Sequence, residues 1–419
     1  MKCVRVFAWL AAIAFVAPIA ARGGWALPHY NAELNPVIHG SPAEFRWQFR
    51  MNEGTSTVPT IDGSTLFVAS NDNGVYAFDL YTGAYKWRTD LPNDVMTPPI
   101  VYKGVVIVGT GGSTSSVWQP PNHIVVGTKG NEIAGLRESD GAILWKYPLR
   151  GTGMPGGILV DGMYIHHDGA GDVVALDWRT GKVRWTRHVV AAAAMSAIAP
   201  AENGRLLLSA GVAPAEIFAL RPDGARVWTY RLPRRASGVA DTPIAADGRN
   251  FACTMYLMPQ NAARFVYVER PVVQHVIALH ASNAKPRWDV VLERGVLHTK
   301  NWAAIPILAN DRIYIGSELR PYVHALDART GRLLWKRKLD GLDQSAGVVK
   351  DGVLYTGDSS GMMWAFNAAT GAVIGSKRFA DGFRVGSPII VGRTLVVGSN
   401  KGFVFAVPLN DILTSHDGG

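Results

Sequence analysis

Short segments in which apolar and polar residues alternate recur along most of the chain. Alternation of this kind places successive side chains on opposite faces of a β-strand. A second strand-like segment that ends in Ala-Leu-Asp or a relative follows, as at 75–79, 173–177 and 323–327. Turn residues separate the segments, as at Asp161-Gly162 and Thr180-Gly181 on either side of 173–177. Such turns between alternating segments are typical of β-hairpins. The pattern therefore predicts antiparallel strands in series.

A tryptophan closes most repeats of this pattern at a fixed distance from a turn. The segment 81–87 ends at Trp87, five later copies also end in tryptophan, and a degenerate copy ends at Gly375. Strand-like segments precede each copy, so one repeat of about 40 residues holds four strands, as a blade of a β-propeller does. The tryptophans of the six intact copies are Trp87, Trp145, Trp185, Trp228, Trp288 and Trp335.

The two ends of the chain supply one further repeat. Segment 387–407 has the strand pattern but no closing strand after it, whereas segment 44–49 contains Trp47 and has no strands before it. The N-terminal strand around Trp47 is therefore expected to complete the last blade and close the ring. The sequence predicts an all-β, eight-bladed β-propeller of four-stranded antiparallel blades.

The repeated tryptophans are expected to be structural. Radially packed blades bury both faces against their neighbours, and an indole on the outermost strand can fill the gap between two blades. A buried indole N–H needs an acceptor, which a backbone carbonyl of the neighbouring blade can supply. This docking role is assigned to Trp47, Trp87, Trp145, Trp185, Trp228, Trp288 and Trp335.

The first residues have the pattern of a secretory signal peptide. Lys2 and Arg5 precede an apolar run of about 16 residues, and small residues up to Ala26 follow. Because about 20 apolar residues are needed to span a bilayer, a retained membrane anchor is the less favoured alternative. The predicted organisation is a signal peptide (1–26), an N-terminal extension (27–40), the propeller (41–409) and a C-terminal tail (410–419). The mature protein is expected in the periplasm, without a transmembrane segment.

Charge and cysteine content fit an exported protein without disulfides. The chain has 42 Lys and Arg residues against 33 Asp and Glu, a net charge of +9. The basic residues are scattered along the sequence, whereas nucleic-acid binding needs a concentrated basic stripe, so no nucleic-acid partner is expected. Cys3 leaves with the signal peptide, and Cys253 then has no disulfide partner. We expect Cys253 to be a buried structural thiol.

The repeat resembles that of a known family. Segments 175–185 and 325–335 follow the motif Ala-Leu-Asp-x-x-Thr-Gly-x-x-x-Trp, which is the tryptophan-docking motif of pyrroloquinoline-quinone (PQQ) type propellers. The resemblance covers about residues 41–409. It is specific for the fold, but function depends on sites that differ between proteins of one fold.

One branch of this family is the quinoprotein alcohol dehydrogenases, which hold PQQ and calcium on the propeller axis. If this chain resembled that branch in function, it would be expected to have a vicinal cysteine pair and a calcium-ligating glutamate after a Gly-Gly pair. Here only Cys253 remains, and Thr114 stands near the place of the glutamate, where a hydroxyl is a poor replacement for a bidentate carboxylate. We therefore expect no catalytic residue and no cofactor, with PQQ plus calcium as the alternative.

A second branch is similar to the propeller lipoprotein of the outer-membrane β-barrel assembly machinery, an eight-bladed scaffold without enzymatic activity. This chain lacks a suitably placed lipid-attachment cysteine. The resemblance implies an exported, monomeric binding or scaffolding protein with a protein partner in the cell envelope. The alternative is a PQQ-binding oxidoreductase or quinoprotein accessory factor with its ligand in the axial funnel.

Two blades are longer than the others and mark one candidate site. Their extra residues fall at 112–131 and 256–274. Loops that depart from a regular scaffold often carry function, and aromatic, arginine and methionine side chains are enriched at interfaces. An extended hairpin without function is the alternative. The candidate partner-binding residues are Trp118, His123, Tyr256, Met258 and Arg264.

The axial channel is the other candidate site, because the segments before the innermost strands line it. Thr57 and Met154 belong to such segments, and the most polar of them is 293–302. A pocket there would hold an anionic or quinone-like ligand, with capping of the channel mouth as the structural alternative. No metal site is expected, since His166 and His167 are adjacent on a strand and point to opposite faces. The candidate ligand-binding residues are Asp241, His298, Lys300, Asn301, Trp302, Gln344 and Arg384.

Overall fold

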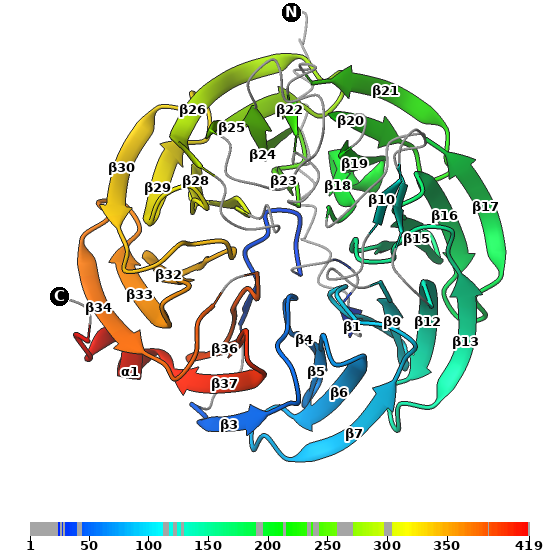
Figure 1. The fold of residues 1–419 in the computed structure, drawn as a ribbon, viewed down its shortest axis with the longest axis horizontal. Helices are drawn as coiled ribbons and strands as arrows, with labels where there is room; N and C mark the ends of the chain where they lie inside the picture. Colours follow the sequence, from blue (N-terminus) through cyan, green and yellow to red (C-terminus); the bar gives the residue numbers. More distant parts are fainter. Residues whose placement is uncertain are drawn as a thin grey trace, which may run out of the picture.

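Eight β-sheets are arranged as blades in a ring around a central axis (Figure 1). In each blade the strands run from the axis to the rim, and neighbours pair antiparallel, apart from one short parallel pair at the inner edge of the last blade. The predicted eight-bladed β-propeller is therefore confirmed. The computed structural model describes residues 24–25, 27, 30–39, 44–111, 117–119, 124–126, 130–189, 196–212, 215–232, 236–237, 243–257, 271–296, 304–383 and 385–417.

The first four blades follow one another along the chain. Blade 1 contains β4 (Thr60–Asp62), β5 (Thr65–Ala69), β6 (Gly74–Asp79) and β7 (Tyr85–Asp90). Blade 2 contains β8 (Ile100–Tyr102), β9 (Val105–Gly109), β12 (Glu132–Arg137) and β13 (Ile143–Pro148), with β1 (Gly24–Trp25) beside β8. Blade 3 contains β14 (Ile158–Val160), β15 (Met163–His167), β16 (Asp172–Asp177) and β17 (Val183–His188). Blade 4 contains β18 (Ala199–Ala201), the short 3₁₀ helix η1 (Glu202–Gly204), β19 (Leu206–Val212), β20 (Ala215–Leu220) and β21 (Arg226–Arg231).

The remaining blades include one with long strands and one that joins both ends of the chain. Blade 5 contains β22 (Ala236–Ser237), β23 (Ala245–Ala246), β24 (Asn250–Leu257), β25 (Pro271–His280) and β26 (Pro286–Val296). Blade 6 contains β27 (Ile307–Ala309), β28 (Arg312–Ile315), β29 (Tyr322–Asp327) and β30 (Leu333–Lys338). Blade 7 contains β31 (Val348–Lys350), β32 (Val353–Gly357), β33 (Met362–Asn367) and β34 (Val373–Arg378). Blade 8 contains β2 (Val37–Ile38), β35 (Ile389–Val391), β36 (Thr394–Gly398), β37 (Phe403–Pro408) and β3 (Trp47–Arg50).

The N-terminal strand closes the ring, as the sequence predicted. Strand β3 pairs antiparallel with β37 and places Trp47 opposite Ala406, so the blue and red ends of the chain share one sheet (Figure 1). In blade 3 Ala175 lies opposite Trp185 in the same way. Blade 8 therefore has the register of a continuous blade, although its strands come from opposite ends of the chain.

The seven predicted docking tryptophans form the expected hydrogen bonds between blades. Each indole Nε1–H donates to a backbone carbonyl of the following blade, at 2.8 Å for Trp47 to Leu80 and 3.2 Å for Trp145 to Trp178. A buried indole N–H is thereby satisfied while the ring fills the gap between blades. The other five pairs are Trp87 with Glu138, Trp185 with Pro222, Trp228 with Ala281, Trp288 with Ala328 and Trp335 with Ala368.

The Thr-Gly turns provide the surface on which these indoles dock. Gly181 has a φ of +67°, in the left-handed region that favours glycine, and a Cβ there would lie 2.6 Å from Cε3 of Trp145. Blade 5 departs from this pattern, because Ala284 takes the equivalent position with a φ of 56°. An alanine in this conformation costs about 1–2 kcal/mol.

Gly375, which replaces the docking tryptophan of blade 7, has a structural explanation. Blade 8 has no turn between its third and fourth strands, because these strands come from different ends of the chain. The helix α1 (Leu409–Leu413) lies at this position instead, and a Cβ on Gly375 would collide with the carbonyl oxygen of Ile412. No helix in the described ranges is long and apolar enough to cross a membrane.

Antiparallel pairing places the connections of every blade on two opposite faces of the ring. The Thr-Gly turns join third to fourth strands and lie on one face. Second-to-third connections and the connections to the next blade lie on the other, which we call the insertion face. Strands β9 and β24 both end on the insertion face, and the two predicted insertions begin there. The segments that line the axial channel lie on the same face.

Candidate functional site

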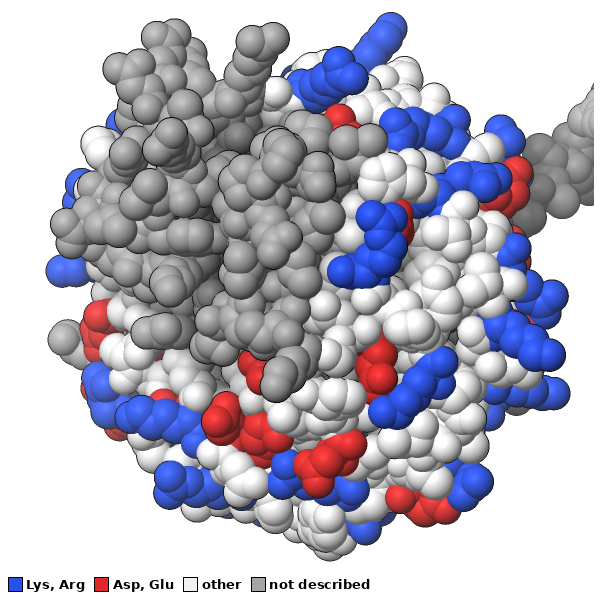
Figure 2. Space-filling model, turned by 45° about the vertical axis from the view of Figure 1, so that its right-hand side comes forward, with Lys and Arg blue, Asp and Glu red and all other residues white. Residues whose placement is uncertain are grey.

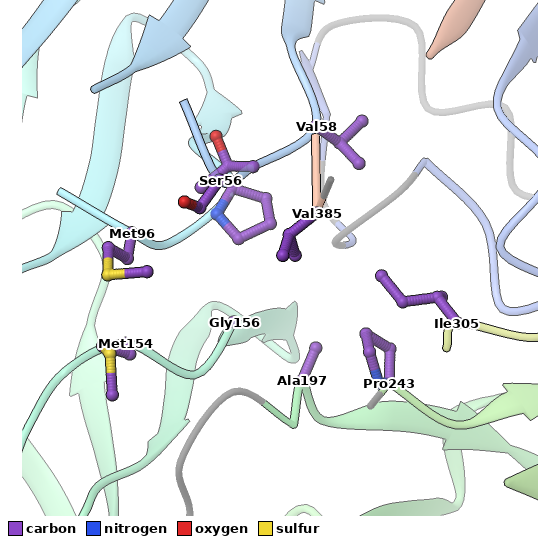
Figure 3. A pocket seen from close by; sticks show the side chains of 11 residues that line it. Ser56, Val58, Met96, Met154, Gly156, Ala197, Pro243, Ile305 and Val385 are labelled. Atoms are coloured by element: carbon purple, nitrogen blue, oxygen red, sulfur yellow. The ribbon is translucent and has the colours of Figure 1, made fainter. Parts of the chain in front are cut away.

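The axial channel narrows to a small cavity lined by uncharged side chains (Figure 3). Connections from seven blades contribute, and Met96, Met154, Ile305 and Val385 surround the space in Figure 3. The cavity volume is about 30 Å³, room for about two water molecules and far below the roughly 300 Å³ of a small-molecule pocket. The lining residues are Ser56, Thr57, Val58, Met96, Pro98, Met154, Gly156, Ala197, Pro243, Ile305 and Val385.

One of the predicted ligand-binding residues falls within the described ranges. Gln344 lies on the connection between blades 6 and 7, with only 1% of its surface exposed. Six others lie outside the described residues, so the polar pocket predicted around 293–302 stays a prediction. These six are Asp241, His298, Lys300, Asn301, Trp302 and Arg384.

The residue before Gln344 is a buried acid that sequence reasoning missed. Asp343 accepts hydrogen bonds from the hydroxyl groups of Thr356 (2.9 Å) and Ser345 (3.4 Å), and it packs against Gly316 of blade 6. Burial raises the pKa of its carboxyl group to about 7, and the negative charge of nearby Asp358 adds to this. No ion pair to Asp343 occurs in the described part of the chain. Asp343 is thus a general acid–base candidate near neutral pH.

Comparison of equivalent positions in different blades would have drawn attention to Asp343. The equivalent residue in blade 1 is Thr55, whose hydroxyl oxygen accepts a hydrogen bond from the backbone N–H of Thr57. An aspartate at a position where another blade carries threonine marks a departure from the repeat. Its burial was not visible from the sequence, because Gly316 and Thr356 come from other strands.

Two other aspartates on the insertion face, Asp168 and Asp358, stabilise turns. Asp358 accepts hydrogen bonds from the backbone N–H groups of Gly341 and Ser360 and from Nε1–H of Trp364 at 2.9 Å. Asp168 holds the equivalent turn of blade 3. The hydrogen bonds from backbone N–H groups to these carboxylates are typical of Asx turns.

The two adjacent histidines of β15 point to opposite sides of blade 3, as predicted. His166 contacts the Tyr164 hydroxyl (3.3 Å) on one side, and His167 contacts the Ser209 hydroxyl (2.9 Å) of blade 4 on the other. Burial lowers the pKa of His166 to about 3, so its imidazole is neutral. Within the ranges the structure describes, no three His, Cys, Asp or Glu side chains gather as a metal site would require.

A buried charged cluster joins blades 5 and 6 beneath the second insertion. The carboxylate of Glu293 contacts His324 Nε2 at 2.9 Å and also pairs with Lys336. Burial opposes ionisation, but these two hydrogen bonds outweigh it and hold the pKa of Glu293 below its usual value. Lys336 Nζ also lies 3.8 Å from the centre of the Tyr322 ring. The cluster anchors the long strand β26 to its neighbour, which is a structural role.

The predicted partner-binding residues divide between core, hairpin and undescribed segments. Tyr256 is fully buried and packs with Val272 and Leu319, so it belongs to the core between blades 5 and 6 and not to an exposed surface. Trp118 lies on β10 (Val117–Gln119), which pairs with β11 (Ile124–Val126) in a hairpin outside the blade sheets. His123, Met258 and Arg264 lie outside the described residues.

The described residues at the axis do not fit PQQ with calcium. Calcium takes six to eight oxygen ligands, several of them carboxylates, and none of the described residues that line the cavity has a carboxylate. The oxygens of Asp343 are engaged by Thr356 and Ser345.

Comparison with known proteins finds one fold with several functions. The outer membrane protein assembly factor BamB of Yersinia pestis is 22% identical over 377 residues, 83% of this chain and 83% of that protein. Tetrathionate hydrolase of Acidithiobacillus ferrooxidans is 24% identical over 376 residues, 86% of this chain and 74% of that protein. The crystal structure of quinohemoprotein alcohol dehydrogenase from Comamonas testosteroni has a TM-score of 0.67 at 12% identity, covering 95% of this chain and 82% of that one. Such a likeness shows the fold and not the function.

A family model extends over nearly the whole ring. Its overlapping matches cover residues 43–193, 120–256, 169–294 and 259–408. They begin just before the closing strand β3 and end with β37, so they include every blade. The chain therefore belongs to the PQQ-repeat propeller family described as outer membrane protein assembly factor BamB.

Proposed function

We propose that this protein is an exported, non-enzymatic propeller that binds a protein partner during protein assembly in the cell envelope. The match of the BamB family model to residues 43–408 carries the proposal. The small volume of the axial cavity between the described residues, about 30 Å³, supports it, because a small-molecule substrate needs a pocket of roughly 300 Å³. A periplasmic location follows from the predicted signal peptide and remains part of the proposal.

The construction of the ring suits a binding scaffold. Docked tryptophans and the closing strand hold the blades in fixed positions, so surface segments are presented with little loss of entropy on binding. The buried Glu293–His324–Lys336 cluster fixes the base of the second insertion in the same way. The insertion face is the natural place for a partner to contact the ring.

Deletion of the gene tests this function directly. Quantitative proteomics of purified outer membranes should show less β-barrel protein in the deletion strain, and wild-type protein should restore the level. Chains shortened at 112–131 or at 258–270 should restore it incompletely if these insertions bind the partner. Unchanged β-barrel levels in the deletion strain would refute the proposed role.

A second candidate, hydrolysis of tetrathionate, rests on the similarity to two tetrathionate hydrolases and on one side chain. Tetrathionate hydrolase matches 86% of this chain, and the buried carboxyl of Asp343 has a raised pKa of about 7, which suits proton transfer at neutral pH. Incubation of purified protein with tetrathionate, followed by ion chromatography, tests it. Tetrathionate consumption by the wild type that is lost in Asp343→Asn would favour the hydrolase over the scaffold.

A further inference from the structure

The junction between blades 7 and 8 carries a groove on the outer side of the ring. Gly375 stands where a docking tryptophan is found in other blades, and α1 fills only part of this seam. Beside the helix lies a groove of about 440 Å³, within the size range of ligand-binding pockets. We call it the seam groove; its lining residues are Arg46, Trp47, Gln48, Lys377, Arg378, Phe379, Ala380, Phe405, Ala406, Val407 and Asp411.

The inner wall of the seam groove is apolar and rigid. Phe379 and Phe405 pack edge to face with ring centres 4.9 Å apart, and Phe405 also stacks on Phe403 at 5.4 Å. Trp47 is fixed by its hydrogen bond to Leu80 of blade 1. Aromatic rings that are fixed by packing and lie beside a polar rim resemble the pockets that accept an anchoring aromatic side chain at protein interfaces.

The rim of the seam groove is positively charged. Arg46, Lys377 and Arg378 contribute three cations, whereas Asp411 is the one acidic residue of the lining and pairs with Arg46 at 2.8 Å. Arg378 pairs with Asp340 at 3.2 Å but remains about half exposed. Lys377 forms no ion pair within the described part of the chain, but the exposed carboxylate of Asp417 lies nearby. That carboxylate accepts a hydrogen bond from the backbone N–H of Arg378 at 2.9 Å, and this bond, together with the charges of Lys377 and Arg378, lowers the pKa of Asp417. An anionic group would therefore meet cationic partners here without displacing a buried ion pair.

The seam groove also lies on a basic belt formed by the outermost strands. Figure 2 brings forward the flank of the ring opposite the seam groove, and Lys and Arg are frequent along its right-hand edge. The acidic residues of the outer strands are Asp90, Asp289 and Glu293. The basic ones are Arg50, Lys86, Arg88, Lys146, Arg184, Arg187, Arg226, Arg231, Arg287, Arg294, Lys336, Arg337, Lys338, Lys377 and Arg378. Some of these cations pair with acidic residues of neighbouring strands, as Lys146 does with Glu132 and Arg184 with Asp177. The excess of cations on the outer strands attracts an acidic partner toward the rim.

We propose that the seam groove binds an acidic segment of a partner protein, with one aromatic side chain against Phe379 and Phe405 and carboxylates paired with Lys377 and Arg378. The charge of the rim selects an acidic segment, and the aromatic wall selects the anchoring residue. This inference rests on the proposed function only in assuming a protein partner; it concerns where that partner docks.

A synthetic peptide tests the proposal without knowledge of the partner. The probe is a fluorescein-labelled pentapeptide with tryptophan between two acidic pairs, acetyl-Asp-Glu-Trp-Glu-Asp-amide, and binding is measured by fluorescence anisotropy. Saturable binding is expected, at least tenfold weaker for the peptide with alanine in place of tryptophan. Binding of the tryptophan peptide should also be weaker at 0.5 M salt than at low salt, because salt screens exposed charges. No saturable binding of the tryptophan peptide up to millimolar concentration would overturn the proposal.

Matched variants locate the binding. Lys377→Gln/Arg378→Gln should weaken peptide binding at least tenfold, and so should Ala380→Trp, which fills the groove from an exposed position. The control Lys182→Gln/Arg187→Gln neutralises two exposed cations of blade 3 and should change affinity less than twofold. Equal losses in the control, or none in the groove variants, would refute the seam groove. If the groove variants lose the peptide but still restore β-barrel levels in the deletion strain, the groove binds as proposed and the assembly function does not depend on it.

Discussion

Asp343 allows a direct test of the electrostatics on the insertion face. Its carboxyl group is fully buried, with a pKa raised from 3.8 to about 7, chiefly by burial. Because the pKa is higher in the folded state, the folded protein binds this proton more tightly than the unfolded chain does. The stability that this proton contributes is complete below pH about 4 and is lost as the pH rises through about 7.

The size of the effect follows from the shift. A difference of about three pH units corresponds to about 4 kcal/mol in total, of which about 2–3 kcal/mol falls between pH 5 and 8.5. Asp343→Asn removes the titration and keeps an oxygen that can accept from Thr356. Relative to wild type, the variant should therefore gain about 2–3 kcal/mol of unfolding free energy from pH 5 to 8.5.

Urea unfolding followed by tryptophan fluorescence at several pH values measures this difference. Asp177→Asn is the matched control, since hydrogen bonds from Arg184 and Thr180 lower the pKa of that exposed carboxyl. Its stability contribution is lost only as the pH falls below the usual range of an aspartate. The control should therefore stay parallel to wild type above pH 5. A parallel profile for Asp343→Asn as well would show that Asp343 does not titrate in this window and would remove the basis for an acid–base role.

Three further predictions concern the docking motif and the channel. Trp335→Ala should lower the unfolding free energy by about 3–5 kcal/mol, because the buried ring and its 3.0 Å bond to Ala368 are lost; an unchanged urea midpoint would contradict the docking role. Ala284→Gly should stabilise the protein by about 1 kcal/mol, because glycine adopts the positive φ at this position without strain. Gly181→Ala should destabilise it by at least as much for the opposite reason. Differential scanning calorimetry of both variants measures these effects, and changes of the opposite sign would contradict the explanation. Titration with PQQ, with and without calcium, should give no saturable micromolar heat or absorbance change, and saturable binding would instead support the quinoprotein alternative.

The candidate sites were less accessible to sequence reasoning than the fold. Segment 293–302 is unusually polar in the sequence, and its first residue, Glu293, lies in a buried charged cluster. Its partners His324 and Lys336 come from the next blade, so the cluster holds two blades together. Tyr256 was expected at a binding surface because aromatic residues favour interfaces, but it faces the packed gap between blades 5 and 6. Burial of this kind depends on the neighbouring blade, which the local pattern does not contain.

The sequence by itself determined the strand order, the number of blades, the closing role of Trp47 and the docking of the tryptophans. These features repeat along the chain, and each is set by turns and alternation within about 40 residues. Only the tertiary structure decided that α1 replaces a docking tryptophan at Gly375, that Asp343 is buried against Gly316, and that scattered basic residues form one belt. The physical reason is that these features arise where blades meet or where the ring closes, between residues that are distant along the chain and therefore leave no periodic mark in it.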